Sequence, residues 1–142
     1  MFNRILIANR GAIAVRIIRT LKKMGIQSVA VYAESDADSL HVRNADEAIS
    51  LGDGAAADTY LDVDKILAAV KSTGAEAIHP GYGFLSENAE FVRRCERENV
   101  AFIGPTPQQM EVFGLKHRAR ELAETAGVPL CPGTDLLRSL EE

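Results

Sequence analysis

The chain has 142 residues, of which 46% are hydrophobic and 25% are charged, and its formal net charge is −4. This length and apolar content suffice for one domain with a full core. Nucleic-acid binding is not expected, because the chain is acidic and its basic residues lack interleaved aromatic side chains. No apolar run approaches the roughly 20 residues of a membrane span, and Met1 leads into a short strand instead of a signal peptide. We therefore expect a cytoplasmic protein without membrane contacts.

The first half of the chain alternates strand and helix patterns. In chain order, the predicted elements are a strand at 5–8, a helix at 11–24, a strand at 28–32, a short helix near 40–43, a strand at 48–51 and a helix at about 62–72. In the last of these helices, Ile66, Leu67 and Val70 are spaced to face a core. Such alternation builds a parallel sheet. We therefore predict an α/β fold, a Rossmann-like parallel sheet flanked by helices.

The first strand-to-helix turn is similar in position to the phosphate-binding turn of dinucleotide-binding domains. It contains Gly11 followed by Ala12, whereas the G-x-G-x-x-G fingerprint needs three glycines for the turn, the pyrophosphate and helix packing. Glu34, at the end of the second predicted strand, could hold a ribose, but one acid without the glycine loop is weak support. Nicotinamide binding is therefore not expected.

Basic residues gather on the first predicted helix. Arg16, Arg19 and Lys23 follow i, i+3, i+7 spacing, which places them along one helical face. One interpretation is a solvated face whose last cations suit the negative end of the helix dipole. The other interpretation is a contact between subunits. The residues alone leave both open.

The run from His79 to Asn88, HPGYGFLSEN, joins the end of a predicted strand at 77–79 to the start of a helix. In open parallel sheets, ligands bind outside the carboxyl ends of the strands, where glycine permits close approach of the backbone. Ser86 is expected to cap the helix, with Glu87 in its first turn. The segment is thus a candidate ligand-binding loop, although a purely structural turn has the same pattern.

The histidines and cysteines offer no clear catalytic or metal site. We expect His79 to be structural, because the strand edge can fix its ring by hydrogen bonding, and we expect His41 and His117 to be solvated. Cys95 and Cys131 lack metal-ligand spacing, and a disulfide is not expected in a reducing compartment. Cys95 is expected to be buried, as free thiols usually are.

The remaining sequence predicts three helices and one strand. They are a helix through Phe91 and Cys95, a strand at 101–103, a short helix between Thr106 and Gly114, and a helix from 115 to about 126. Lys116 falls in the first turn of the last helix, where the dipole disfavours a cation by about 0.3–1 kcal/mol. A phosphate close by would reverse that sign. Otherwise Lys116 is an ordinary surface lysine.

Three separated motifs resemble biotin carboxylases, the ATP-dependent enzymes that carboxylate biotin. They are IANRG at 7–11, HPGYGFLSEN at 79–88 and FIGP at 102–105, and the resemblance covers nearly the whole chain. Biotin carboxylases consist of an amino-terminal α/β domain, an ATP-grasp domain and a carboxyl-terminal domain. The resemblance implies that residues 1–114 form the amino-terminal α/β domain and that residues 115–142 lead into an ATP-grasp domain outside this sequence.

The resemblance also implies roles for individual residues. Lys116 matches a lysine that contacts ATP, and Tyr82 and Gly83 match a wall of the biotin and bicarbonate pocket. Arg16 and Arg19 match arginines at the subunit contact of biotin carboxylase dimers. The general base and the Mg²⁺ ligands of the family lie in the other two domains, so neither a catalytic residue nor a metal ligand is expected here. The implied cofactors are ATP, biotin and Mg²⁺.

Two positions depart from the family pattern. Lys23 stands where bacterial homodimeric enzymes commonly have an acid, and this departure argues against an identical dimer. Ala12 stands where most biotin carboxylases have glutamate, which removes a carboxylate beside a helix amino terminus. The sequence does not define the effect of either change.

One branch of the family matches more closely in detail. The run at 114–123 resembles urea carboxylases, in which G-L-K-H-x-A-R recurs and which are often part of urea amidolyases, and residues 16–23 point the same way. The alternative within the family is an acyl-CoA or pyruvate carboxylase. Alternatives from other classes are a stand-alone nucleotide-binding protein or a dimerisation module. The implied partners are the other two domains of the same chain, a biotinyl carrier domain and a second copy, and the fragment alone is expected to be inactive.

Overall fold

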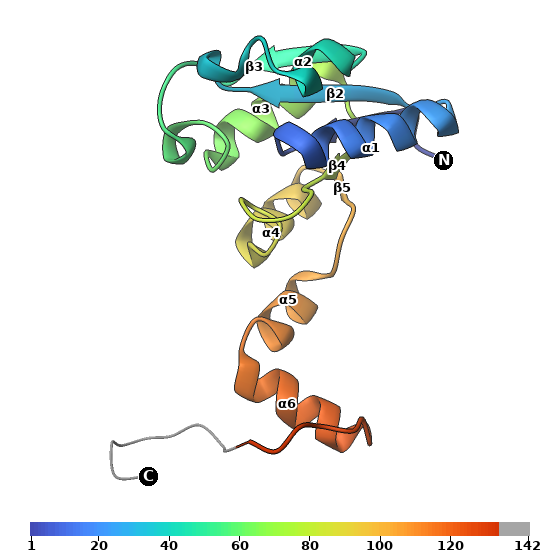
Figure 1. Cartoon of the computed structure of the whole chain (residues 1–142), viewed down its shortest axis with the longest axis vertical. Helices are drawn as coiled ribbons and strands as arrows, with labels where there is room; N and C mark the ends of the chain where they lie inside the picture. The colour runs from blue at the N-terminus through green and yellow to red at the C-terminus, as the bar shows by residue number, and fades with distance from the viewer. Residues whose placement is uncertain (134–142) are drawn as a thin grey trace.

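The computed structural model describes residues 1–133, in which five parallel strands form one sheet (Figure 1). The sheet has the order β3-β2-β1-β4-β5. Its strands are β1 (Arg4–Ile7), β2 (Gln27–Tyr32), β3 (Glu47–Ser50), β4 (Ala77–His79) and β5 (Ala101–Phe102). The chain moves outward from β1 to β3 on one side and then crosses to β4 on the other. The topological switch point therefore lies between β1 and β4, where open α/β sheets bind ligands.

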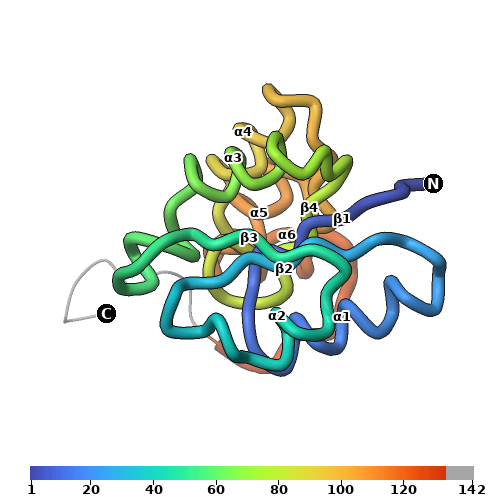
Figure 2. The backbone as a smooth tube through the Cα atoms, turned by 90° about the horizontal axis from the view of Figure 1, so that it is seen from above, coloured from blue at the N-terminus to red at the C-terminus, as the bar shows by residue number. Residues whose placement is uncertain are grey.

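Helices cover both faces of this sheet. They are α1 (Gly11–Met24), α2 (Leu40–Asn44), α3 (Val63–Thr73) and α4 (Ala89–Arg97). Figure 2 shows α1 and α2 on one side of the strands and α3 and α4 on the other. The central strand, β1, contacts the helices on both faces because its side chains point alternately to the two faces of the sheet. Leu6 packs in the core with α3 and α4, whereas Ile5 and Ile7 pack in the core with α1.

Apart from the start of α4, the observed elements begin and end within one residue of the bounds that the sequence predicts. Gly25 ends α1 with a left-handed φ of 70°, a conformation that glycine adopts without steric cost. Ile66, Leu67 and Val70 of α3 are buried as predicted, and so is Cys95 of α4. Two short 3₁₀ turns, Glu34–Asp36 and Ala56–Asp58, were not predicted.

The start of α4 corrects the predicted helix cap. Ser86 lies in a turn that precedes the helix, and its backbone N–H donates to the carbonyl of Gly83. The capping residue is Asn88, whose side-chain oxygen accepts a 2.9 Å hydrogen bond from the N–H of Phe91. Glu87 is therefore outside the first turn of α4. The loop after β4 is longer than the sequence pattern suggested.

His41 corrects a second prediction, because it is buried with 1% of its surface exposed. It belongs to α2, and its Nε2 lies 3.3 Å from the carbonyl oxygen of Val31 in β2. Burial, the largest influence, lowers the pKa of His41 and outweighs the hydrogen bond to Val31 and the charge of Asp36, which oppose it. His41 is thus a neutral part of the interior. His117 is exposed, as predicted.

Two further helices, α5 (Pro107–Phe113) and α6 (Lys116–Thr125), extend away from the sheet (Figure 1). Thr106 and Gln109 cap α5 reciprocally, and Pro107 occupies its first turn. None of the residues of α6 is buried. Within residues 1–133, the helices are all too short or too polar to cross a membrane.

Candidate functional site

The sheet topology places the turn after β1 beside the loop after β4. The two strands pair in parallel with Ile7 opposite His79, and the N–H of Ala8 donates to the carbonyl of His79 at 3.0 Å. Both connections therefore leave the carboxyl edge of the sheet together. Asn9 and Arg10 follow β1, and Pro80 begins the loop that contains Tyr82 and Gly83.

The loop after β4 has an unusual backbone. Gly81 and Gly83 each have a φ of 66°, and Phe84 has a φ of 43°, which non-glycine residues rarely adopt. Tyr82 lies between the two glycines with 67% of its surface exposed. A Cβ built on Gly83 would meet no other heavy atom of the described chain within 4 Å. The loop thus presents Tyr82 and Gly83 outward with open space before the backbone.

Asn9 anchors the first part of this loop. Its buried side chain donates from Nδ2 to the carbonyl oxygens of Pro80 at 2.7 Å and of Tyr82 at 2.8 Å. A Cβ on Gly81 would lie 2.8 Å from the same Nδ2 atom. Glycine is therefore required at position 81 for close approach as well as for its backbone conformation.

Aromatic and charged side chains hold the second part of the loop. Phe84 stacks on Tyr60 with ring centroids 5.1 Å apart and an interplanar angle of 9°. The guanidinium carbon of Arg10 lies 5.2 Å from the Tyr60 ring centroid and 5.8 Å from that of Phe84, within cation–π range. Arg10 also pairs with Asp36 at 2.9 Å. The sequence analysis did not identify this cluster, because its members come from four separate connections.

Asp36 completes the cluster by accepting from both neighbours. The Tyr60 hydroxyl donates to Asp36 at 2.6 Å and accepts from the N–H of Ala33 at 3.0 Å. Burial is the largest single influence on Asp36 and opposes its ionisation, but the hydrogen bonds from Tyr60 and Arg10 outweigh it and lower its pKa. Burial and the bond to Asp36 together raise the pKa of Tyr60. The cluster is therefore a neutral phenol and an ion pair at neutral pH.

His79 has the structural environment that the sequence predicted. Its Nδ1 accepts a 3.1 Å hydrogen bond from the N–H of Gly81, so the ring helps to turn the loop. Burial lowers the pKa of His79, and the charge of Arg16 lowers it further. A neutral imidazole whose Nδ1 is already occupied is suited to hold the loop.

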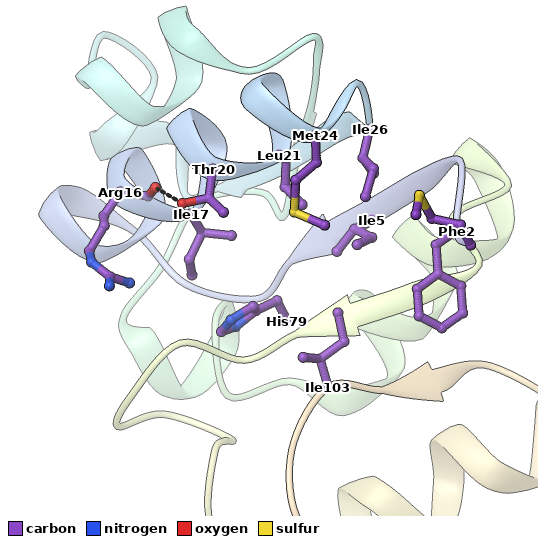
Figure 3. A pocket seen from close by; sticks show the side chains of 11 residues that line it. Phe2, Ile5, Arg16, Ile17, Thr20, Leu21, Met24, Ile26, His79 and Ile103 are labelled. Carbon is purple, nitrogen blue, oxygen red and sulfur yellow. Dashed lines mark hydrogen bonds between the residues drawn. The ribbon is translucent and has the colours of Figure 1, made fainter.

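An apolar cavity of about 470 Å³ lies between α1 and the β4–β5 side of the sheet. Figure 3 shows Arg16 and His79 at one end of this cavity and Phe2 at the other. Arg16 is exposed, and its carbonyl accepts a hydrogen bond from the hydroxyl of Thr20. Arg19 is exposed on the same helix but outside the cavity lining.

Lys116 lies at a different hollow of about 540 Å³, between the loop and the helical extension. Ser86 and Glu87 line it from the loop side, and Phe113 lines it from α5. Lys116 is the first residue of α6, and Leu115 before it has no polar side chain to cap the helix. The hollow thus combines a cation with a helix amino terminus, a combination suited to phosphate. Tyr82 and Gly83 lie outside its lining.

The described residues, 1–133, contain no cluster of three or more His, Cys, Asp or Glu side chains placed to hold a metal ion. Both cysteines are free thiols, Cys95 buried and Cys131 exposed. The polar groups at the carboxyl edge instead bond to the loop and to one another, as for Asn9 with Pro80 and Arg10 with Asp36.

Known proteins are similar to this chain in sequence and in fold. Residues 1–110 match the family model described as "Biotin carboxylase, N-terminal domain". The chain is 57% identical over 141 residues to urea amidolyase of Lachancea kluyveri, covering 99% of this chain and 8% of that protein. It is 54% identical over 142 residues to biotin carboxylase of Halalkalibacterium halodurans, covering 100% of this chain and 31% of that protein.

A solved structure agrees with these matches. The biotin carboxylase domain dimer of Hydrogenobacter thermophilus 2-oxoglutarate carboxylase, in complex with MgADP, ADP and bicarbonate, superimposes with a TM-score of 0.89 at 46% identity, covering 99% of this chain and 31% of that chain. The present chain therefore spans less than a third of the length of each of these relatives. Because the family model matches most of the sequence and the fold superimposes on that of a biotin carboxylase domain, the chain belongs to the family of biotin carboxylase N-terminal domains.

Proposed function

We propose that this chain acts as the amino-terminal part of an ATP-dependent biotin carboxylase, which uses bicarbonate to carboxylate biotin. The observation that carries the proposal is the loop after β4, which presents Tyr82 and an unobstructed Gly83 at the switch point of the sheet. A relative of the same fold is described in complex with MgADP and bicarbonate, which supports a site of this chemistry. The loop would then form a wall of the biotin and bicarbonate pocket.

Lys116 is proposed to bind the nucleotide. It lies at a hollow beside the free N–H groups that begin α6, and both features attract phosphate. Phosphoryl transfer depends mainly on placing charges around the phosphates, and Mg²⁺ supplies part of that charge when bound. We place the Mg²⁺ ligands and the general base in the ATP-grasp and carboxyl-terminal domains. This chain's own residues would therefore bind and orient the substrates.

The domain division and the partners follow the same proposal. Residues 1–114 would be the amino-terminal α/β domain, and residues 115–142, of which the structure describes those to 133, would lead into the ATP-grasp domain. The biotinyl carrier domain would deliver biotin to Tyr82 and Gly83. Arg16 and Arg19 are exposed on α1 and available for a dimer contact, and one relative is described as a dimer.

Within the family, we propose the urea carboxylase branch, with urea as the final carboxyl acceptor. The support is the G-L-K-H-x-A-R pattern at Gly114–Arg120 and the 57% identity to a urea amidolyase. Acyl-CoA or pyruvate as acceptor is the alternative, because a biotin carboxylase matches at 54%. Carboxylation assays with urea and with acyl-CoA or pyruvate on the full-length protein would distinguish them.

The test of the proposed function is Gly83→Val in the full-length enzyme. A β-branched side chain at a φ of 66° strains the backbone and would also stand in the proposed biotin pocket. Gly74→Val is the matched control, because Gly74 ends α3 with the same φ of 66° and equally open surroundings among the described residues. We expect both variants to lose similar thermal stability and only Gly83→Val to lose biotin carboxylation.

The pair Gly83→Ala and Gly74→Ala repeats the comparison with less strain if valine prevents folding. Bicarbonate-dependent ATP hydrolysis and carboxylation of free biotin would be measured on the same preparations, with the isolated 142-residue chain expected to be inactive. Equal carboxylation by the two glycine variants, after correction for folded protein, would remove the loop from the site. Hydrolysis by the isolated chain above a buffer blank would contradict the proposed division of labour.

A further inference from the structure

We propose that Asn9, Arg10 and Tyr60 are positioning residues that hold the loop after β4 in the conformation that presents Tyr82 and Gly83 to substrate. Together with Asp36 and Phe84 they are called the loop clamp below. The inference rests on the proposed function, because it assigns the clamp to the biotin and bicarbonate side of that site. None of these five residues lines the hollow of Lys116.

The loop needs such support because its own backbone does not fix it. Three residues within four, Gly81, Gly83 and Phe84, have positive φ. Glycine has more conformational freedom than any other residue, and the left-handed conformation is unfavourable for phenylalanine. A free loop of this sequence would therefore populate other conformations. The native one must be selected by contacts outside the loop.

Asn9 supplies the first contact through its amide. Its Nδ2 donates to the carbonyls on both sides of Gly81, and its Oδ1 accepts the N–H of Arg10 at 2.9 Å. The side chain is only 3% exposed, so water competes little for these bonds. One buried amide thus fixes the direction of the 80–81 and 82–83 peptide groups, the second of which leads into Gly83.

Tyr60 and Arg10 supply the second contact through Phe84. The Tyr60 ring is 1% exposed and stacks against Phe84, while the hydroxyl is held on both sides by Asp36 and by the N–H of Ala33. Arg10 lies over both rings and is neutralised by Asp36. The stack therefore stabilises the positive φ of Phe84, which is the residue directly after Gly83.

The clamp brackets Tyr82 and Gly83 from both sides without covering them. Phe84 belongs to the loop itself, and the other four clamp residues come from the connections after β1, after β2 and before α3, which meet the loop at the carboxyl edge of the sheet. Small displacements of positioned groups can lower an enzyme rate by about 100-fold. Loosening the clamp should therefore impair the use of biotin and bicarbonate and spare the binding of ATP.

The experiment compares Asn9→Ala, Tyr60→Leu and Tyr60→Phe in the full-length enzyme, with Arg43→Met as the control. Arg43 pairs at 3.3 Å with the exposed Asp38, away from the loop. Tyr60→Phe keeps the ring stack and should restore most of what Tyr60→Leu loses. The measurements are kcat/KM for free biotin, KM for ATP, thermal stability, and amide hydrogen exchange at residues 81–85.

We expect kcat/KM for biotin to fall about 10- to 100-fold in Asn9→Ala and Tyr60→Leu, with KM for ATP within about twofold of the parent. Exchange at 81–85 should accelerate in the same two variants and not in Arg43→Met. Parallel losses for biotin and ATP, or unchanged loop exchange, would overturn the proposal. A parent enzyme without carboxylase activity would refute the proposed function instead, while loop exchange would still decide whether the clamp orders the loop.

Discussion

The sheet and the helical extension, residues 105–133, bury very different shares of their apolar side chains. In the sheet and its four helices, two hydrophobic cores are sealed, and large side chains such as Phe91 and Ile18 are fully buried. In the extension, Phe113, Leu115 and Leu122 are exposed. The first region is stabilised by its own packing, whereas the second buries only Pro107 and Met110 of α5 and none of the residues of α6.

This difference separates the two halves of the proposed site. The loop with Tyr82 and Gly83 is fixed by contacts within the sheet region. Lys116 lies on the extension, and α5 touches the sheet region mainly through α4, including the ion pair of Arg93 with Glu111. The proposed wall of the biotin pocket would thus be held in place by contacts within this chain. Lys116 has few contacts of this kind to hold it, so the proposed nucleotide side is the less fixed of the two.

The largest expected effect is the loss of stability on removing a buried aromatic side chain from the sheet region, compared with an exposed one from the extension. Phe91→Ala should lower the free energy of unfolding by about 3–5 kcal/mol, because Phe91 is buried and meets Phe102 edge to face at 5.9 Å. Phe113→Ala should change it by less than about 0.5 kcal/mol, since the ring is 59% exposed. Urea unfolding of the 142-residue chain measures both. A large loss for Phe113→Ala would show that the extension is part of the core.

A smaller effect is expected from Lys116→Ala in the full-length enzyme. Loss of one charge-assisted contact to ATP should weaken nucleotide use by about 1.5–3 kcal/mol, seen as a higher KM for ATP with little change for biotin. Lys116→Arg should retain part of the affinity, and Lys71→Ala, which removes a surface ion pair with Glu98, serves as the control. If Lys116→Ala leaves ATP dependence unchanged, Lys116 is an ordinary surface lysine.

The smallest effect concerns acid pH, which should weaken the sheet region through His41. Burial lowers the pKa of His41, so below about pH 6.5 the unfolded chain takes up a proton that the folded chain resists. The contribution of neutral His41 to the free energy of unfolding is therefore fully present above that pH. It is lost as the pH falls, by at most about 1.4 kcal/mol per pH unit.

Urea unfolding at pH 7.5 and 5.5 tests this on the parent, His41→Gln and His117→Gln. Glutamine at position 41 can still donate to Val31 and does not titrate. The free energy of unfolding of His41→Gln should therefore fall less between the two pH values than that of the parent. His117 is exposed on the extension, and its replacement should leave the loss unchanged. Identical losses in all three proteins would mean that His41 is accessible to protons.

The sequence predicted the regular elements well because their patterns are local. The short apolar runs of β1 and β2, the glycine at the end of α1 and the proline at the start of α5 each act within a few residues. The same locality explains the error at α4. Ser86 and Asn88 are both residue types that cap helices well. Ser86 is part of the preceding turn, so the helix is capped by Asn88.

Burial in short elements and contacts between distant ones were beyond sequence patterns. The helix α2 has five residues, too few for periodicity to show that His41 faces inward. Asn9, Asp36, Tyr60 and Phe84 are brought together only by the order of the strands, which no local pattern encodes. The candidate ligand loop was therefore recognisable in sequence, whereas the side chains that shape it were not.

The two cysteines differ in exposure, so that one of them can be labelled selectively. Burial raises the pKa of the Cys95 thiol to about 12, so this sulfur is protonated and shielded from reagents at neutral pH. Cys131 is exposed beyond α6, where its carbonyl accepts from Arg120 at 2.9 Å. A maleimide dye should therefore attach to Cys131 alone. Its fluorescence would report directly whether another domain binds to the extension.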